Sequence, residues 1–366
     1  MLFDPKPKER REDLFDRDDE LSKLRLGLNY PITLLLGIRR SGKSSLIKVL
    51  MNEEKNNDIW LYIDLRKYEG HAYLTYRHLI SEFERALNTW PEWLKKLLHG
   101  IRGISISSPG IEVRLSWGKN RVELADLFDK LSEISERESK RVIIVFDESQ
   151  ELRKLKGYNI LYPLAYAYDN LKLHFLLTGS QIGMVYRFLR LNDPDSPLFG
   201  RAMYEVFIKP FTREQAIEFL KAGFREVGLS VSNEYLEDAY NNLGGIPGWL
   251  TFYGFNYLQS GNHYESIRRT LEYAIDLIKQ EFENFLKNRE EARERYYTLM
   301  MICSHGCRWS DAKRYLEAKE GVRIDDKKIT ELLQNLVDSS FLMKENDIYK
   351  PSDPLIAKAF ETDLTK

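Results

Sequence analysis

A nine-residue stretch, GIRRSGKSS from Gly37 to Ser45, has the spacing of a phosphate-binding loop. Gly37, four intervening residues, and then Gly42, Lys43 and Ser44 match the P-loop pattern. The glycines let backbone N–H groups turn toward phosphates, Lys43 would reach the β- and γ-phosphates, and the Ser44 hydroxyl would ligate Mg²⁺. A glycine-rich turn without a ligand is the alternative, and it leaves the lysine and serine unexplained. The stretch therefore predicts ATP or ADP bound with Mg²⁺.

An acidic pair, Asp147-Glu148, supplies the second half of this chemistry at the end of the apolar run RVIIVF. At the carboxyl end of a strand, Asp147 can hold Mg²⁺ through water, and Glu148 can orient or deprotonate an attacking water. An acidic pair alone could also cap a helix. Paired with an upstream phosphate-binding loop, it predicts hydrolysis of the nucleotide rather than transfer to a small-molecule hydroxyl.

Further polar residues extend the predicted site. Thr178, in LHFLLTGSQIG, could read the γ-phosphate or hold the attacking water, although a strand-end turn with a capping Ser gives the same pattern. Arg201 could act as an arginine finger in cis or in trans, or make a surface salt bridge. The loop also contributes nucleotide-binding candidates whose types the pattern leaves open: Arg39, Arg40, Ser41 and Ser45. For Arg39 and Arg40, pairing with neighbouring acidic groups is the default interpretation. Contact with a phosphate or with a partner is the more specific hypothesis.

These residues require a sheet that brings strand ends together. Over the first 210 residues short apolar runs alternate with helical patterns, which is typical of a parallel sheet covered on both faces. We predict an α/β ATPase domain over residues 1–210 with five strands: Ile32 to Leu36, Ile59 to Ile63, Val142 to Phe146, Leu173 to Thr178 and Tyr204 to Ile208.

A departure from this alternation occupies residues 91–122. The stretch ISISSPGIEVRLSW alternates apolar and polar residues around Pro109-Gly110, which predicts a two-stranded hairpin. The segment carries six Lys and Arg against two Glu, a net charge of 6 − 2 = +4. A solvated edge insertion and a contact with a partner or nucleic acid are both open. The residues predicted to share one face are Ile104, Ile106, Ile111, Val113, Leu115 and Trp117.

The character of the chain changes twice more. After Pro210 the strand patterns stop, and Thr212 is placed to cap an amphipathic helix, so residues 211–290 are predicted to be all-helical. Residues 291–366 show three helical patterns, near 292–303, 310–318 and 327–338, followed by two short runs joined by a turn at Glu345-Asn346-Asp347. Three helices followed by a hairpin suggest a winged helix.

The composition of the chain limits which partners and which cellular compartment we expect. The formal net charge is −1, so no overall basic field points to nucleic acid. The longest apolar runs are far below the ~20 residues of a membrane helix. Two cysteines, Cys303 and Cys307, are too few for a disulfide framework and fit a reducing compartment, so we expect buried thiols in a cytoplasmic protein. With His305 they offer three soft donors, but zinc needs a fourth.

Together these motifs resemble the archaeal ATPase family of the STAND class of P-loop NTPases, relatives of AAA+ and origin-recognition proteins. The matching pieces are FDRDDELSKL, GIRRSGKSSL, IVFDESQEL, FLLTGSQIGM, the FGR…IKPF passage and GGIPGWL, which follow the family's order over residues 15 to 250. The resemblance implies a sheet of order 51432, with the Thr178 strand between those that carry Lys43 and Asp147. It also implies a helical lid and a C-terminal winged helix.

The resemblance extends to the nucleotide base. It implies that Phe15 and Arg17 lie near the adenine, with Asp16 at a position where the family usually has Gly. It also implies that Pro247, in GGIPG, packs on the base from the lid, although Gly and Pro also end helices. Nucleotide clamped between two domains would make the angle between the domains depend on the γ-phosphate.

We therefore predict a regulatory ATPase that hydrolyses ATP slowly and acts as a conformational switch on an unknown protein partner, with nucleotide-dependent homo-oligomers allowed. An ATP-gated DNA-binding protein of the initiator or transposition-helper kind is the alternative. Against it, residues 291–366 carry 13 Lys and Arg and 14 Asp and Glu, and a domain of net charge 13 − 14 = −1 should bind DNA weakly. A scaffold that holds ADP without turnover is a third hypothesis.

Overall fold

A five-stranded parallel sheet forms the centre of the computed structural model, which describes residues 1–107, 111–116, 121–287 and 289–361. Across the sheet the strands lie in the order β9-β1-β8-β6-β2. Numbered 1 to 5 along the chain, these five strands follow the order 51432, which confirms the prediction. Each strand lies within one residue of its predicted bounds. The strands are β1 (Ile32–Leu36), β2 (Asp58–Asp64), β6 (Arg141–Asp147), β8 (Leu173–Gly179) and β9 (Tyr204–Phe207).

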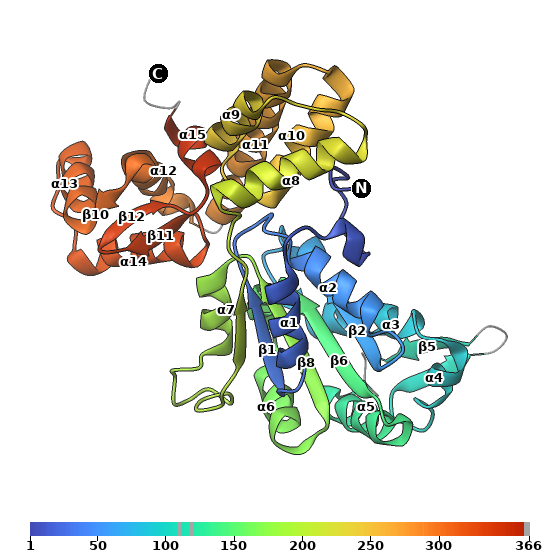
Figure 1. Cartoon of the computed structure of the whole chain (residues 1–366). Helices are drawn as coiled ribbons and strands as arrows, with labels where there is room; N and C mark the ends of the chain where they lie inside the picture. The colour runs from blue at the N-terminus through green and yellow to red at the C-terminus, as the bar shows by residue number, and fades with distance from the viewer. Residues whose placement is uncertain (108–110, 117–120, 288, 362–366) are drawn as a thin grey trace.

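Helices cover both faces of this sheet (Figure 1). Because side chains alternate along a strand, Ile143 and Val145 of β6 pack toward α1 and α2, while Ile144 and Phe146 pack toward the layer of α3 and α5. Burial on both faces explains the continuous apolar runs. The helices are α1 (Asp18–Gly27) and α2 (Lys43–Glu53) on one face, and α3 (Tyr76–Asn88), α5 (Leu124–Glu138), α6 (Leu161–Asn170) and α7 (Ile182–Leu189) on the other.

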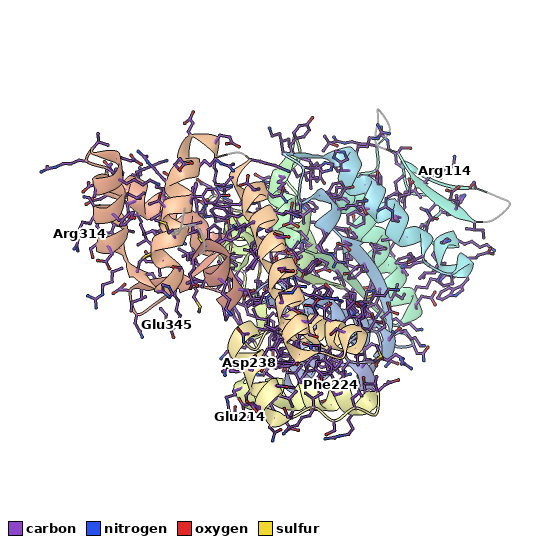
Figure 2. All side chains as sticks on the ribbon, turned by 90° about the horizontal axis from the view of Figure 1, so that it is seen from above. Arg114, Glu214, Phe224, Asp238, Arg314 and Glu345 are labelled. Carbon is purple, nitrogen blue, oxygen red and sulfur yellow. A yellow bond between two sulfur atoms is a disulfide. The ribbon has the colours of Figure 1, made fainter. Side chains whose placement is uncertain are left out.

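The predicted hairpin is present as β4 (Ile104–Ser107) and β5 (Glu112–Leu115), after the short α4 (Glu92–Lys96). Ile104 pairs with Leu115 and Ile106 with Val113, so these four share a face that packs on the core, as predicted. The Asn88 side chain ties β5 to α3 by bonding both main-chain groups of Val113. Figure 2 shows Arg114 of this hairpin and Arg314 of the winged helix at opposite ends of the molecule. Pro109-Gly110, Trp117 and Lys119 lie outside the described residues.

Four helices follow the sheet and form the lid. Thr212 caps the first of them through a reciprocal capping box with Gln215, which confirms the predicted start. The lid core also receives the ring of Phe3, which lies so close to Gly223 and Gly254 that a Cβ at either position would overlap it. The lid helices are α8 (Arg213–Glu226), α9 (Asn233–Leu243), α10 (Pro247–Ser260) and α11 (His263–Leu286).

The C-terminal region is a winged helix, as the pattern suggests. Asn346 and Asp347 both have positive φ, which suits the tight turn of the wing. A final helix, which the sequence did not indicate, packs its Phe360 ring on Phe282 of α11 at 4.8 Å between centroids. The lid and the winged helix therefore share one continuous core. The elements are α12 (Arg293–Ile302), β10 (Cys307–Arg308), α13 (Trp309–Glu320), α14 (Asp326–Asp338), β11 (Leu342–Glu345), β12 (Ile348–Pro351) and α15 (Pro354–Glu361).

The expectation of two reduced thiols is wrong. Cys303 and Cys307 form a disulfide, with their Cα atoms 4.7 Å apart. A short 3-10 turn followed by Gly306 at φ 92° folds the chain back and brings the two Cα atoms within bonding range. Within the described residues no group of His, Cys, Asp and Glu is arranged to hold a metal ion, so the zinc reading of this segment has no support.

Across the described part of the chain, every helix is too short or too polar to cross a membrane.

Candidate nucleotide site

The stretch from Gly37 to Ser45 connects the carboxyl end of β1 to the start of α2, where the sheet faces the lid (Figure 1). Gly42 has φ 100°, a conformation that glycine adopts easily and that turns the loop into the helix. A cavity of about 440 Å³ opens here, between the loop, the N-terminal segment and the lid. The predicted site residues that line it are Phe15, Arg17, Arg39, Arg40, Ser41, Gly42, Lys43, Ser44, Ser45, Glu148 and Pro247.

The loop presents polar groups that suit an anion. The Lys43 ammonium donates to the main-chain oxygens of Gly37 at 2.8 Å and Ile38 at 2.9 Å rather than to a carboxylate. Burial lowers the pKa of Lys43, while Glu148 and Asp147 act against that change. The hydroxyl of Ser41 is buried and has no hydrogen-bond partner in the described structure. Because an unpaired buried hydroxyl is unfavourable, the loop fits a phosphate that would accept from it.

Asp147 lies behind the loop and accepts from several hydroxyl groups. Ser44 Oγ donates to Oδ2 at 3.0 Å, and Thr178 Oγ1 donates to Oδ1 at 2.5 Å. Tyr62 also donates to Oδ2, and burial together with Asp147 raises the pKa of this tyrosine, which keeps it a donor. A serine hydroxyl beside an oriented carboxylate is the donor set that Mg²⁺ takes in phosphate sites, directly and through water. These residues fit a nucleotide-bound Mg²⁺.

Glu148 borders the cavity in a left-handed conformation with φ 58°. Its Oε2 accepts from Gln150 Nε2 at 2.6 Å and from both the hydroxyl and the main-chain N–H of Ser180, at 2.7 and 3.0 Å. Burial alone would raise the pKa of Glu148, but Lys43 and these hydrogen bonds lower it. The carboxylate is therefore ionised and held by residues that follow β6 and β8.

Thr178 is placed differently from the prediction. Its hydroxyl is buried, donates to Asp147 and accepts from the main-chain N–H of Glu148 at 3.1 Å. It does not line the cavity, so in this structure it orients the acidic pair instead of meeting the γ-phosphate. Ser180, two residues further on, is the polar group that faces the cavity.

An aromatic group forms the other end of the cavity. Phe15 packs edge-to-face on Phe211 and Phe219, and the Arg17 guanidinium lies 4.5 Å from the centre of the Phe211 ring. Asp16, at the family's usual Gly position, has φ 45°, so it adopts the conformation that Gly would supply. Pro247 is the first residue of α10 and faces this aromatic group from the lid.

The two loop arginines contact the lid. Arg39 Nη1 and Arg40 Nη2 both donate to Oε1 of Glu281 in α11, at 2.9 and 2.5 Å. Arg39 also pairs with Glu69, and Arg40 lies 4.3 Å from the Trp249 ring centre. The sequence favoured acidic partners for these arginines but could not identify them.

Arg201 is not part of this cavity. It pairs with Asp169 at the end of α6 and lies just before β9, at the amino ends of the strands. The phosphate-binding loop lies at the opposite, carboxyl ends. Within one chain Arg201 therefore cannot reach the phosphates, and only a role in trans stays a prediction.

Sequence comparison assigns the family. Residues 14–251 match the protein family described as an ATPase domain predominantly from Archaea. This chain belongs to that archaeal ATPase family. The archaeal ATPase is 37% identical to a Walker-type ATPase of Pyrococcus abyssi of known structure, with a TM-score of 0.84 over 98% of this chain and 99% of that one. It is 24% identical to an ATP-binding protein of Methanocaldococcus jannaschii, covering 92% of this chain and 93% of the relative.

Two further similarities concern fold. Residues 290–352 of the archaeal ATPase match the C-terminal winged helix-turn-helix domain of MCM proteins. The ORC2 protein of Aeropyrum pernix, solved in ADPNP and ADP complexes, superimposes with a TM-score of 0.59 at 12% identity over 100% of this chain and 98% of that one. At that identity the similarity shows the shared fold alone.

Proposed function

We propose that this archaeal ATPase is a STAND-type switch that hydrolyses ATP slowly in a Mg²⁺-dependent reaction and changes the orientation of its lid and winged helix with nucleotide state. The observation that carries the proposal is the shared carboxylate of Glu281, which accepts from both Arg39 and Arg40 of the phosphate-binding loop. Glu281 is a lid group, and a γ-phosphate bound by the loop would compete with it for the same donors, which supports the proposal.

Different residues around the cavity would bind the phosphates, hold Mg²⁺ and accept a proton from the attacking water. Lys43 and the Ser41 hydroxyl would bind the phosphates, and Ser44 with Asp147 would hold Mg²⁺, which screens the phosphate charge when bound. Glu148 is ionised and able to accept a proton from water. Its carboxylate is, however, engaged by Ser180 and Gln150. Attack requires that these hydrogen bonds be rearranged, which supports slow turnover.

A chain of contacts extends from the loop to the winged helix. Beyond Glu281, the Arg40 guanidinium stacks on Trp249 of α10. The Trp249 Nε1–H donates to Oδ2 of Asp353 at 2.8 Å, at the start of α15. The main-chain oxygen of Arg40 also accepts from Gly248 N at 3.0 Å. A shift of Arg40 would therefore act on the lid and the winged helix together, and their shared core supports movement as one unit.

Spectroscopic labels can test this switch. Arg137 on α5 and Arg314 on α13 have side chains that are 69% and 79% exposed, so label pairs there report the distance between the sheet and the winged helix. We expect this distance to differ between the ATP and ADP states, and the difference to disappear in Glu281→Gln. The matched control is Glu272→Gln, on the same helix but paired with Arg268. Equal distances in both nucleotide states of the wild type would reject the switch.

DNA binding is the second candidate function, favoured by the match to the MCM winged helix. Since α15 packs on α11, the winged helix should be tested in the full chain. Lys327→Glu with Lys328→Glu at the start of α14 should weaken binding if that helix contacts DNA. Salt-independent or absent binding at about 50 mM salt would exclude direct contact.

A scaffold that only holds ADP differs from both candidates in the fate of the nucleotide. Bound nucleotide extracted from the purified protein, together with phosphate release after ATP is added, separates it from a slow ATPase. Persistent ADP with no phosphate release would favour the scaffold.

A further inference from the structure

A second, smaller cavity of about 90 Å³ lies at the junction of the sheet, the lid and the winged helix. The segment η3 (Ser149–Lys154), which follows Glu148, borders it on one side, and the end of α11 borders it on the other. Ser339 and Phe341, between α14 and β11, complete its wall. The cavity thus exists only while the winged helix is docked against the sheet.

Positive charge in this cavity exceeds what the protein neutralises. Arg39 is paired with Glu69 and Glu281, and Lys154 is paired with Glu151. The remaining lining cations, Arg153, Lys287 and Arg289, have no carboxylate in ion-pair contact within the described ranges. Arg289 bonds instead to the main-chain oxygen of Phe285 at 2.6 Å and lies over that residue's ring.

Two of these cations, Arg153 and Arg289, lie close enough to repel each other. Burial lowers the pKa of Arg289, Tyr296 raises it, and the neighbouring guanidinium groups of Arg153 and Arg187 lower it. The side chain of Arg153 is exposed to solvent at its surface, and its pKa is lowered by partial desolvation, raised by Glu151 and lowered by Arg187. Like charges held together without counterions destabilise a protein unless an anion offsets them. The junction is therefore prepared for a negatively charged ligand.

The surroundings favour a polymer over a single small anion. Arg187 of α7 lines an open groove of about 590 Å³ between α7 and α14, where it pairs with Asp338, and Arg190 in the same groove pairs with Asp193. Electrostatic interaction links Arg187 to both Arg153 and Arg289, so the groove and the junction cavity adjoin through this residue. Because Asp338 and Asp193 neutralise the groove arginines, the phosphates would be held at the junction itself. The three junction cations that have no carboxylate in ion-pair contact among the described residues carry more charge than one phosphate, so they suit successive phosphates of a backbone.

We propose that the cluster Arg153, Lys287 and Arg289 binds the phosphate backbone of a nucleic acid that crosses the junction between the sheet and the winged helix. Guanidinium groups suit phosphate oxygens because they offer paired donors in fixed geometry. Contacts of this kind fix position without reading sequence. The proposal differs from DNA binding by the winged helix alone, because the decisive cations belong to the sheet and the lid.

The location also suggests an effect on turnover. Arg153 lies five residues after Glu148, in the same η3 segment as Gln150, which holds the Glu148 carboxylate. A backbone phosphate that moves Arg153 would displace Gln150 and free Glu148. This consequence rests on the proposed ATPase activity, whereas the binding itself does not.

Binding can be measured with the full chain and a fluorescent 30-nucleotide single strand or the matching duplex, titrated with salt. The double variant Arg153→Glu/Arg289→Glu should lower affinity at least about tenfold and reduce the slope of log K against log salt by about 2. The control Arg137→Glu makes the same kind of charge change at a distant exposed site and should stay within about twofold. Thermal melting and ATP binding verify the fold of each variant.

Milder variants keep the test valid if the double variant does not fold. Arg153→Ala and Lys287→Ala, made separately at exposed positions, should each weaken binding about two- to fivefold. Inorganic polyphosphate should compete at matched phosphate concentration, while monomeric phosphate should not. The proposal is overturned if the full chain does not bind at about 50 mM salt, if Arg137→Glu and the double variant lose affinity equally, or if monomeric phosphate competes as well as polyphosphate. If nucleic acid binds as expected but its addition does not change phosphate release from ATP, only the proposed coupling to Glu148 is rejected.

Discussion

The nucleotide cavity and the winged helix treat their charged groups in opposite ways. In the cavity, Lys43 donates to main-chain oxygens and the Ser41 hydroxyl is buried without a partner in the described structure. On the wing, Lys344 is paired with Asp347 and Lys350 with Glu345. The cavity leaves the Lys43 and Ser41 donors available to a ligand, although its Arg39 and Arg40 are paired with Glu281, whereas the wing pairs both lysines internally. Unused donors, more than the name of a fold, therefore indicate where a ligand binds.

The largest expected effect is on the donor at the centre of the cavity. Lys43→Ala removes the ammonium proposed to bind the phosphates and should weaken ATP binding at least about 100-fold by calorimetry. Lys48→Ala is the matched control, because Lys48 lies on the same helix, is paired with Glu9 and should change affinity less than twofold. Similar losses in both variants would mean that α2, rather than the ammonium, was damaged.

The next effect separates binding from hydrolysis. Glu148→Gln keeps the size of the side chain but removes the base, so phosphate release should fall by about 10²- to 10⁴-fold. ATP affinity should stay within about threefold, because Glu148 borders the phosphate end without donating to it. Unchanged turnover would transfer the role of base to another residue and leave the phosphate-binding loop intact.

The sequence was most informative where structure depends on local order. The five strands could be predicted because each is a short apolar run buried on both faces, and the loop from Gly37 to Ser45 because its function requires fixed residue types at fixed spacing. Thr212 was recognisable as a helix cap for the same reason. In each case the signal lies within a few consecutive residues.

Contacts between distant segments could not be predicted in this way. Glu281 is one of many acidic residues on the long polar face of α11, and nothing in its neighbours marks it as the partner of Arg39 and Arg40. The hydrogen bond from Trp249 to Asp353 joins residues 104 positions apart. The disulfide depended on a backbone turn at Gly306, which the spacing of two cysteines does not reveal. Arg201 is a different case, because it precedes the predicted strand at Tyr204 and a parallel sheet already puts such a residue at the amino ends, away from the phosphate-binding loop.

Asp353 makes the connection between lid and winged helix dependent on pH. Burial raises its pKa to about 6, against hydrogen bonds from Trp249 and the Leu355 N–H that lower it, with Arg40 lowering and Glu281 raising it further. The folded state therefore holds a proton that the unfolded state releases near pH 4. Stability should fall by up to about 3 kcal/mol as pH rises from about 4 to 6 and then level off.

The variant Asp353→Asn isolates this contribution. The difference in melting temperature between wild type and Asp353→Asn should change across pH 4 to 6 in favour of the wild type at the acidic end. Parallel melting curves over that range would show that Asp353 titrates normally. Because the group belongs to the winged helix, a strong effect would also show that this region is stabilised through the lid.

The smallest expected effect concerns the wing itself. Because Lys344 and Lys350 are already paired with Asp347 and Glu345, replacing both lysines by Ala should change nucleic-acid affinity less than about twofold in the salt titration described above. Asp347→Asn with Glu345→Gln provides the converse test, since it frees both lysines and should strengthen binding. A loss of tenfold or more in the lysine variant would mean that internally paired cations still contact the backbone. That result would remove the contrast between the two regions. It would assign nucleic-acid binding to the wing lysines instead of to Arg153 and Arg289.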